Sequence, residues 1–100
     1  MEITKTTSEN IITLAVEGRL DTATSSQLEL EVNELFKEEK PNIVFDFASL
    51  EYISSAGLRI LLAAQKQANA LGTEMKIIGA NDLVKEIFEI TGFSDIMQIC

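Results

Sequence analysis

The sequence predicts an α/β fold in which helices back a mixed β-sheet of about four strands. Segments with strand-like alternation or short apolar runs are separated by segments with helical periodicity, in the order β-β-α-β-α-β-α. This order is typical of a sheet covered by helices. The chain has 100 residues, of which 46% are hydrophobic, which suffices for one core and leaves no room for a second. We therefore expect a single domain over residues 1–100.

Two strands are expected at the start of the chain. Residues 2–8 alternate weakly, with Ile3 as the only large apolar side chain, which suits an edge strand. Residues 8–10 are polar turn formers and are expected to join it to a second strand. Three apolar side chains of that strand point to one face: Ile12, Leu14 and Val16. We expect Gly18 to end this strand.

The first helix is expected to begin near residues 24–26, because two capping-box patterns overlap there. They pair Thr24 with Gln27 and Ser26 with Glu29. The inward face is formed by four apolar residues at helical spacing: Leu28, Val32, Leu35 and Phe36. The acidic outer face is by default a solvated surface. Pro41 is expected to stop this helix and to lead into a buried strand at residues 43–47.

The second half of the chain alternates helix, strand and helix. A central helix is expected over residues 55–71 and a strand over residues 75–79. Asn81 or Asp82 is expected to cap a third helix. Five apolar residues of that helix are expected to face the core: Leu83, Val84, Ile87, Phe88 and Ile90. The tail after it carries enough apolar side chains to dock on the same core.

The start of the central helix carries the most informative stretch, Ser54-Ser55-Ala56-Gly57. The first N–H groups of a helix lack intrahelical partners and lie at the positive end of the helix dipole. A hydroxyl here can cap the helix, and a phosphate attached to it would meet free donors. One cap is enough, so we expect Ser54 to cap the helix and Ser55 to be its first residue; simple capping is the alternative for Ser55. Gly57 sacrifices about 1 kcal/mol of helix propensity relative to Ala, which indicates a close approach to the backbone.

The stretch Asp46-Phe47-Ala48-Ser49-Leu50-Glu51-Tyr52-Ile53-Ser54-Ser55-Ala56-Gly57-Leu58 resembles the signature of STAS-domain anti-sigma factor antagonists. In that family the loop reads Asp-Leu-Ser, a short spacer, and then Met-Asp-Ser-Ser/Thr/Ala-Gly-Leu. Gly18-Arg19-Leu20-Asp21 is similar to the family's Gly-x-Leu-Asp before its first helix. The resemblance covers almost the whole chain and implies the STAS architecture.

The resemblance also implies roles for individual residues. It places Ser55 at the family's regulatory phosphorylation site and Ser54 at its signature aspartate, so a carboxylate beside the acceptor is absent here. Asp21 either contacts the kinase or another partner, or holds the entry of the first helix. Arg59 is either a partner contact or a solvated charge, and Asp46 is interpreted as structural. The expected partner-binding residues are Asp21, Ser54, Gly57, Leu58 and Arg59.

The function implied by the resemblance is that of a bacterial regulator of transcription that acts through protein–protein interaction. Its unphosphorylated form would bind an anti-sigma factor, a serine kinase related to the histidine-kinase ATPase fold, and so free the sigma factor. Phosphorylation of Ser55 would release it, and a metal-dependent serine phosphatase would reset it. The alternative is a STAS accessory subunit of a lipid-trafficking or other transport complex, which binds an ATPase without being phosphorylated.

Composition excludes several other classes of function. The chain has no His and one Cys, Cys100, which rules out His-dependent triads, His zinc ligands and thiolate clusters. We expect no catalysis, cofactor or metal; a hydrolase, the third class considered, would also need a Gly-x-Ser-x-Gly turn. The net charge of −8 argues against nucleic acid and favours a basic protein surface. No apolar run approaches the roughly 20 residues of a membrane span and nothing resembles a signal peptide, so we expect a cytoplasmic protein.

Overall fold

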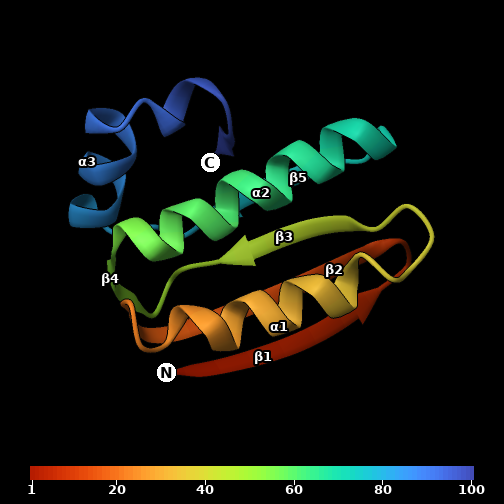
Figure 1. Cartoon of the computed structure of the whole chain (residues 1–100), viewed down its shortest axis with the longest axis horizontal. Coiled ribbons are helices and arrows are strands. Elements are labelled where there is room, and N and C mark those ends of the chain that lie inside the picture. The colour runs from red at the N-terminus through yellow and green to blue at the C-terminus, as the bar shows by residue number, and fades with distance from the viewer.

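One mixed β-sheet organises the fold, and the computed structural model describes residues 1–100 of it (Figure 1). The elements in chain order are β1 (Glu2–Ser8), β2 (Ile11–Leu20), α1 (Ser25–Leu35), β3 (Asn42–Asp46), β4 (Leu50–Ile53), α2 (Ser55–Leu71), β5 (Met75–Ile78), α3 (Asp82–Ile90), a 3₁₀ turn (Phe93–Asp95) and β6 (Gln98–Ile99). The strands lie in the spatial order β1-β2-β3-β5-β6, with β4 paired to the end of β2. Only β1 and β2 are antiparallel. The expected α/β class is confirmed, with two short strands, β4 and β6, beyond the expected four.

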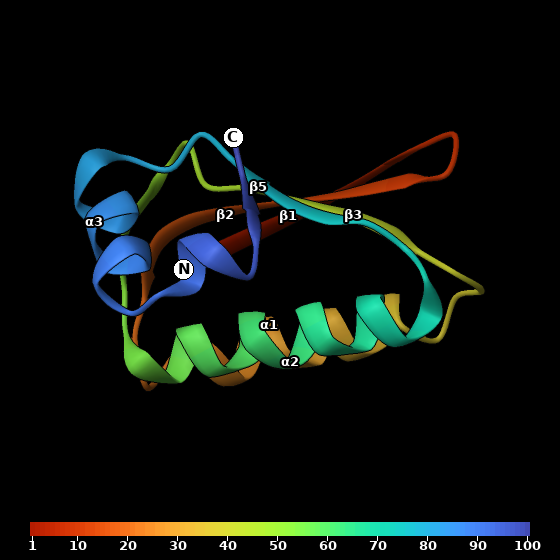
Figure 2. The same cartoon turned by 90° about the horizontal axis from the view of Figure 1, so that it is seen from above.

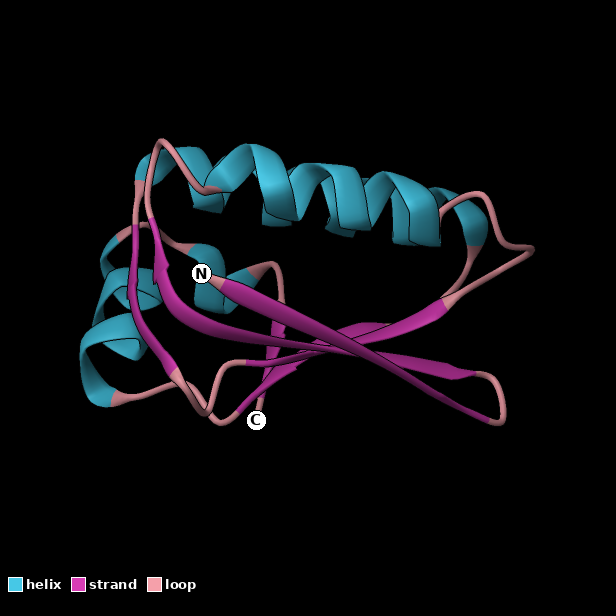
Figure 3. Cartoon of the chain, turned by 90° about the horizontal axis from the view of Figure 1, so that it is seen from below, coloured by secondary structure: helices cyan, strands magenta, loops and turns pink.

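The long helices α1 and α2 lie side by side on one face of the sheet, and α3 lies at the end near β4 (Figures 2 and 3). The core fills the space between this face and the helices. Leu14, Phe45 and Ile77 of the central strands are fully buried there, as are Leu28 of α1 and Leu61 of α2. Complete burial of such a side chain contributes about 1.5–3 kcal/mol. None of the helices combines the length and the apolar character needed to span a bilayer.

The first hairpin forms as expected, with β1 at the edge of the sheet and a turn at residues 9–10. Gly18 does not end β2, contrary to expectation. It forms a bulge in which its φ is +101°, a conformation that glycine adopts without steric cost. Its N–H donates to the carbonyl oxygen of Ser49 at 3.0 Å. The bulge carries β2 on to Leu20 and lets its last residues pair with β4.

The first helix begins where one of the two capping patterns predicts, with Thr24 at the N-cap, although the Thr24 side chain makes no capping hydrogen bond. Its end was predicted wrongly. The helix ends at Leu35, before Pro41, and the chain then turns through Lys40 with a φ of +53°. Residues 37–40 are all charged, so a longer helix would bury nothing against the sheet, and packing is what stabilises most protein helices. Pro41 instead precedes β3.

The helix α3 is capped by Asn81, whose Oδ1 accepts a hydrogen bond from the Val84 N–H at 2.8 Å. Val84 and Phe88 face the core, but two of the five apolar residues expected there do not. Leu83 is 50% exposed and Ile90 is 77% exposed. At about 100° per residue these two side chains share one flank of the helix, well away from Val84. The apolar stripe is therefore wider than the surface the core offers.

The tail docks on the core as expected. It passes through the 3₁₀ turn, buries Met97 and adds β6 parallel to β5. The strand β6 has only two residues, which is too short for a recognisable alternation.

Candidate functional site

The candidate site lies where β4 meets α2, and Ser54 organises it. The Ser54 N–H donates to the Leu20 carbonyl oxygen at 2.8 Å, which ties the junction to the end of β2. The Ser54 Oγ accepts a hydrogen bond from the Gly57 N–H at 3.4 Å, and its carbonyl oxygen accepts one from the Leu58 N–H at 2.9 Å. Ser54 is thus the N-cap of α2, as the sequence predicts.

Ser55 is the first residue of α2 and is exposed. Its hydroxyl makes no hydrogen bond within the protein, because the capping role belongs to Ser54. The N–H groups of Ser55 and Ala56 have no intrahelical acceptor, because the hydrogen bonds of the helix begin with the Leu58 N–H donating to the Ser54 carbonyl oxygen. An exposed hydroxyl, free N–H donors and the positive end of the helix dipole therefore meet at one point on the surface.

Gly57 is buried, and its close neighbours belong to the chain itself. A Cβ atom at this position would lie 2.7 Å from Leu20 Cγ and 3.0 Å from Ile53 Cγ1. The interpretation of Gly57 as a place where a partner approaches the backbone is therefore replaced by a packing role. Leu58 is only 7% exposed and belongs to the core. Gly57 and Leu58 are two of the five residues expected to bind a partner. Because they are buried, they can support binding only indirectly, by fixing the shape of the loop.

Asp21 lies in the loop between β2 and α1 and fastens that loop. Its Oδ1 accepts a hydrogen bond from the Thr24 N–H at 2.9 Å, and the Asp21 N–H donates to the Thr24 Oγ1 at 2.9 Å. The hydrogen bonds from Thr24 hold the pKa of the Asp21 carboxyl below its usual value. Of the two roles considered for Asp21, the structure shows the one that holds the helix entry. The loop follows Leu20 directly and so is joined to Ser54.

Asp46 likewise has the structural role expected of it. Its Oδ1 accepts a hydrogen bond from the Ala48 N–H at 3.0 Å and so shapes the turn after β3.

The two arginines of the chain both lie near this junction. The Arg19 guanidinium stacks on the Tyr52 ring, 4.6 Å from its centroid, because the end of β2 is in register with β4. Arg59 is exposed on α2. The Arg19–Tyr52 contact was missed by sequence reasoning, since it depends on a four-residue strand whose pattern overlaps the loop motif.

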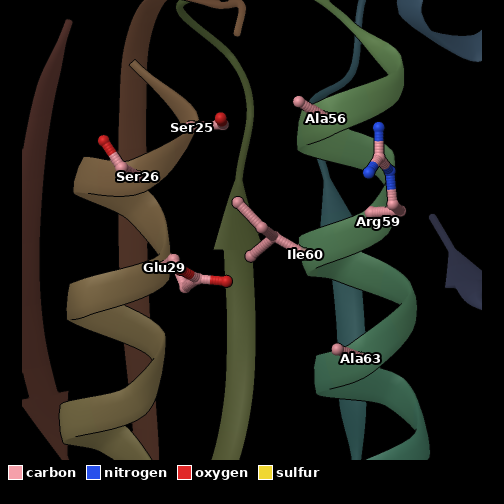
Figure 4. Close-up of a pocket in the computed structure, with 7 residues that line it drawn as sticks. All are labelled: Ser25, Ser26, Glu29, Ala56, Arg59, Ile60 and Ala63. Carbon is pink, nitrogen blue, oxygen red and sulfur yellow. The ribbon is translucent and has the colours of Figure 1, made fainter. Parts of the chain in front are cut away.

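A shallow groove of about 260 Å³ runs between α1 and α2 and reaches Ala56, the residue after Ser55 (Figure 4). It is lined by Ser25, Ser26 and Glu29 of α1 and by Ala56, Arg59, Ile60 and Ala63 of α2. Ser25 was not singled out from the sequence, and Ser26 and Glu29 were considered only as a capping pair, because the contact of all three with α2 depends on how the two helices pack. The groove offers one cation, one carboxylate and two hydroxyls, a set suited to contact with another protein. The structure holds no group of three or more acidic or cysteine side chains placed to bind a metal ion.

A family model and a relative identify the family of this chain, and solved structures share its fold. The family model of the STAS domain matches residues 2–100. The protein BtrV of Bordetella bronchiseptica, described as an anti-sigma factor antagonist, is 31% identical over 99% of this chain and 85% of its own length. The crystal structure of a protein described in the same way from Thermotoga maritima superposes with a TM-score of 0.90 at 17% identity, covering 97% of this chain and 84% of that one. The Bacillus cell fate determinant SpoIIAA, solved in its phosphorylated form, gives a TM-score of 0.78 at 14% identity, covering 99% and 91%.

Proposed function

The chain belongs to the STAS domain family, with relatives described as anti-sigma factor antagonists over nearly its full length, and on that basis we propose that it is a phosphorylation-controlled member of that class. The observation that carries the proposal is that two adjacent serines have different structural roles. Ser54 caps α2, while Ser55 presents a free hydroxyl at the first helical position. A phosphorylated form of the structural relative SpoIIAA has been solved.

In the proposed cycle the unphosphorylated protein binds a cytoplasmic anti-sigma factor and so frees the sigma factor. The anti-sigma factor is a serine kinase with a histidine-kinase-like ATPase fold, and it phosphorylates Ser55. The phosphorylated protein is released until a serine phosphatase removes the phosphate. The protein takes part as a binding partner and phosphate acceptor, without catalysis of its own. Its net charge of −8 favours a basic partner surface.

The charge on the phosphate accounts for release of the partner. A phosphoserine carries about −1.5 to −2 charges at neutral pH. A partner carboxylate about 6 Å away would repel it by roughly 1 kcal/mol in water-like surroundings and by about 5 kcal/mol at an effective dielectric near 20. Because about 1.4 kcal/mol changes the affinity tenfold, an intermediate value already separates the complex.

Release of the partner by the charge of the phosphate does not require an aspartate at the position that Ser54 occupies. Asp and Ser are comparable N-cap residues, and Ser54 performs the capping here. What the substitution removes is one negative charge beside the acceptor hydroxyl. We propose that Ser55 is still the acceptor, because its exposure and its place at the helix start do not depend on that charge.

Incubation with the cognate anti-sigma factor and ATP tests the proposal, with the phosphate located by mass spectrometry. We expect one phosphate on Ser55 in the wild type and in Ser54→Ala, and none in Ser55→Ala. Phosphate mainly on Ser54 would mean that the assignment is off by one residue. An ATPase partner that binds the protein tightly but transfers no phosphate would instead identify an accessory subunit of a transport complex.

A further inference from the structure

Arg59 is a cation without an internal partner. It lies on α2 four residues after Ser55 and is exposed. The only salt bridge in the structure joins Lys37 to Glu34, and no side-chain hydrogen bond involves Arg59. The other arginine of the chain, Arg19, is already stacked on Tyr52. In a protein with eight basic and sixteen acidic residues, the Arg59 guanidinium is thus free to pair with an anion that arises on the same helix face.

The helix geometry directs Arg59 toward Ser55. Residues four apart lie on the same face of a helix, with Cβ atoms about 5–6 Å apart. Helical side chains also lean toward the N-terminus of their helix. Figure 4 shows this for Arg59, whose guanidinium extends from its own turn back toward the turn that carries Ala56. Because Ser55 is four residues before Arg59, about 40° away around the helix axis and one turn nearer the N-terminus, we expect a phosphate on Ser55 to project from the same face as the guanidinium.

The surroundings leave the guanidinium available. Glu29 of α1 lines the same groove, but no carboxylate oxygen lies within 4.0 Å of the Arg59 nitrogens. Ala56 and Ala63 are too small to obstruct the movement of the Arg59 side chain. A phosphate dianion on the same helix face would be a stronger attractor than a single carboxylate across the groove, because guanidinium and phosphate match in charge and in bidentate geometry.

We propose that Arg59 is the internal receptor of the phosphate on Ser55, a regulatory contact that rests on the proposed function of that serine. In the unphosphorylated protein the guanidinium is unpaired, one helical turn after Ser55. In the phosphorylated protein it pairs with the phosphate and fixes it over the first turn of α2. Phosphorylation then does two things to the surface that a partner meets: it adds an anion, and it occupies the one cation of the groove.

The test uses protein in which phosphoserine is installed at position 55 during translation, so that no kinase is needed. The second pKa of the phosphate, about 6 for an ordinary phosphoserine, is followed by ³¹P NMR at 0.15 M salt. We expect this pKa to be lower in the wild type than in Arg59→Gln by about half a unit or more. Arg59→Lys should keep part of the difference, because it retains the charge without the bidentate geometry.

Lys66→Gln is the matched control. It removes the same charge from the same helix, eleven residues beyond Ser55 and so about 16 Å along the axis, where salt screens the interaction. It should leave the phosphate pKa unchanged. Equal pKa values in the wild type and Arg59→Gln, or equal shifts in Arg59→Gln and Lys66→Gln, would overturn the inference. A positive result stands even if no kinase is found to modify Ser55; that failure would count against the proposed function instead.

Discussion

The backbone of Gly57 packs so closely against Leu20 that a methyl group would lie 2.7 Å from the Leu20 Cγ atom. The contact joins the start of α2 to the end of β2, the same two segments that the Ser54 N–H and the Leu20 carbonyl oxygen join by a hydrogen bond. The position of Ser55 is therefore set by the core of the domain, and the junction of β4 and α2 is formed without a partner.

Gly57→Ala should destabilise the protein, although Ala is the better helix former. Overpacking of a filled core costs about 1–3 kcal/mol. The gain in helix propensity is about 1 kcal/mol, so the cost of overpacking equals or exceeds it. Urea unfolding measures the free energy. The double variant Gly57→Ala/Leu20→Ala should show a favourable coupling, because the smaller side chain makes room for the methyl group. A single variant more stable than the wild type would contradict the packing role of Gly57.

Ser54→Ala should cost about 0.5–1 kcal/mol of stability through loss of the N-cap, while Ser54→Asp should match or exceed the wild type, because a carboxylate also favours the helix N-terminus. Thermal melts of the two variants compare them directly. Ser55→Ala serves as the control and should leave the melting temperature unchanged, since the Ser55 hydroxyl makes no hydrogen bond. A larger loss of stability for Ser55→Ala than for Ser54→Ala would mean that Ser55, and not Ser54, caps the helix.

The Asp21 carboxyl should titrate below its ordinary value of 3.8, because Thr24 donates hydrogen bonds to its charged form. A depressed pKa adds stability at pH values above the unfolded pKa, and this contribution is lost as the pH falls through the folded value. NMR titration of the carboxyl in the wild type and in Thr24→Val measures the part due to the Thr24 hydroxyl, since the variant keeps the backbone N–H that is the larger cause. The variant should bring the pKa back toward 3.8, and the stability difference between wild type and Asp21→Asn should shrink below that pH. An Asp21 pKa that does not respond to Thr24→Val would show that the Thr24 hydroxyl makes no contribution, and a wild-type pKa at or above 3.8 would contradict the whole explanation.

Leu83→Gln and Ile90→Gln should each change the unfolding free energy by no more than about 0.5 kcal/mol, since both side chains are largely exposed. Phe88→Ala on the same helix should cost about 3–5 kcal/mol, because Phe88 is fully buried. Chemical denaturation of the three variants provides the comparison. A large loss for either polar variant would mean that the flank of α3 is covered in solution.

Local signals predicted the junction well. Adjacent serines followed by a helical pattern were enough to place Ser54 as the cap and Ser55 as the first helical residue, because capping depends on neighbours within three or four positions. The strands of the first hairpin and the end of α2 are likewise encoded by short-range pattern. These features need no knowledge of the tertiary packing.

The features that the sequence did not reveal depend on contacts between distant residues. A glycine is needed at position 57 because Leu20, 37 positions earlier, packs against it. The bulge at Gly18 exists because β2 pairs with both β3 and β4. Which apolar residues of α3 are buried depends on how much of the core faces that helix. The sequence pattern alone therefore wrongly predicted that Leu83 and Ile90 are buried.

The affinity of the phosphorylated protein for its anti-sigma factor tests the central claim most directly. Calorimetric titration would compare wild type, phospho-Ser55 protein and Ser55→Ala, with the melting temperature of each measured in parallel. We predict that phosphorylation weakens binding at least about tenfold, while the melting temperature is unchanged or slightly higher because the phosphate lies at a helix N-terminus; Ser55→Ala should bind like the unphosphorylated wild type. Equal affinity of the phosphorylated and unphosphorylated forms, or a markedly lower melting temperature on phosphorylation, would contradict a switch that works by charge on Ser55.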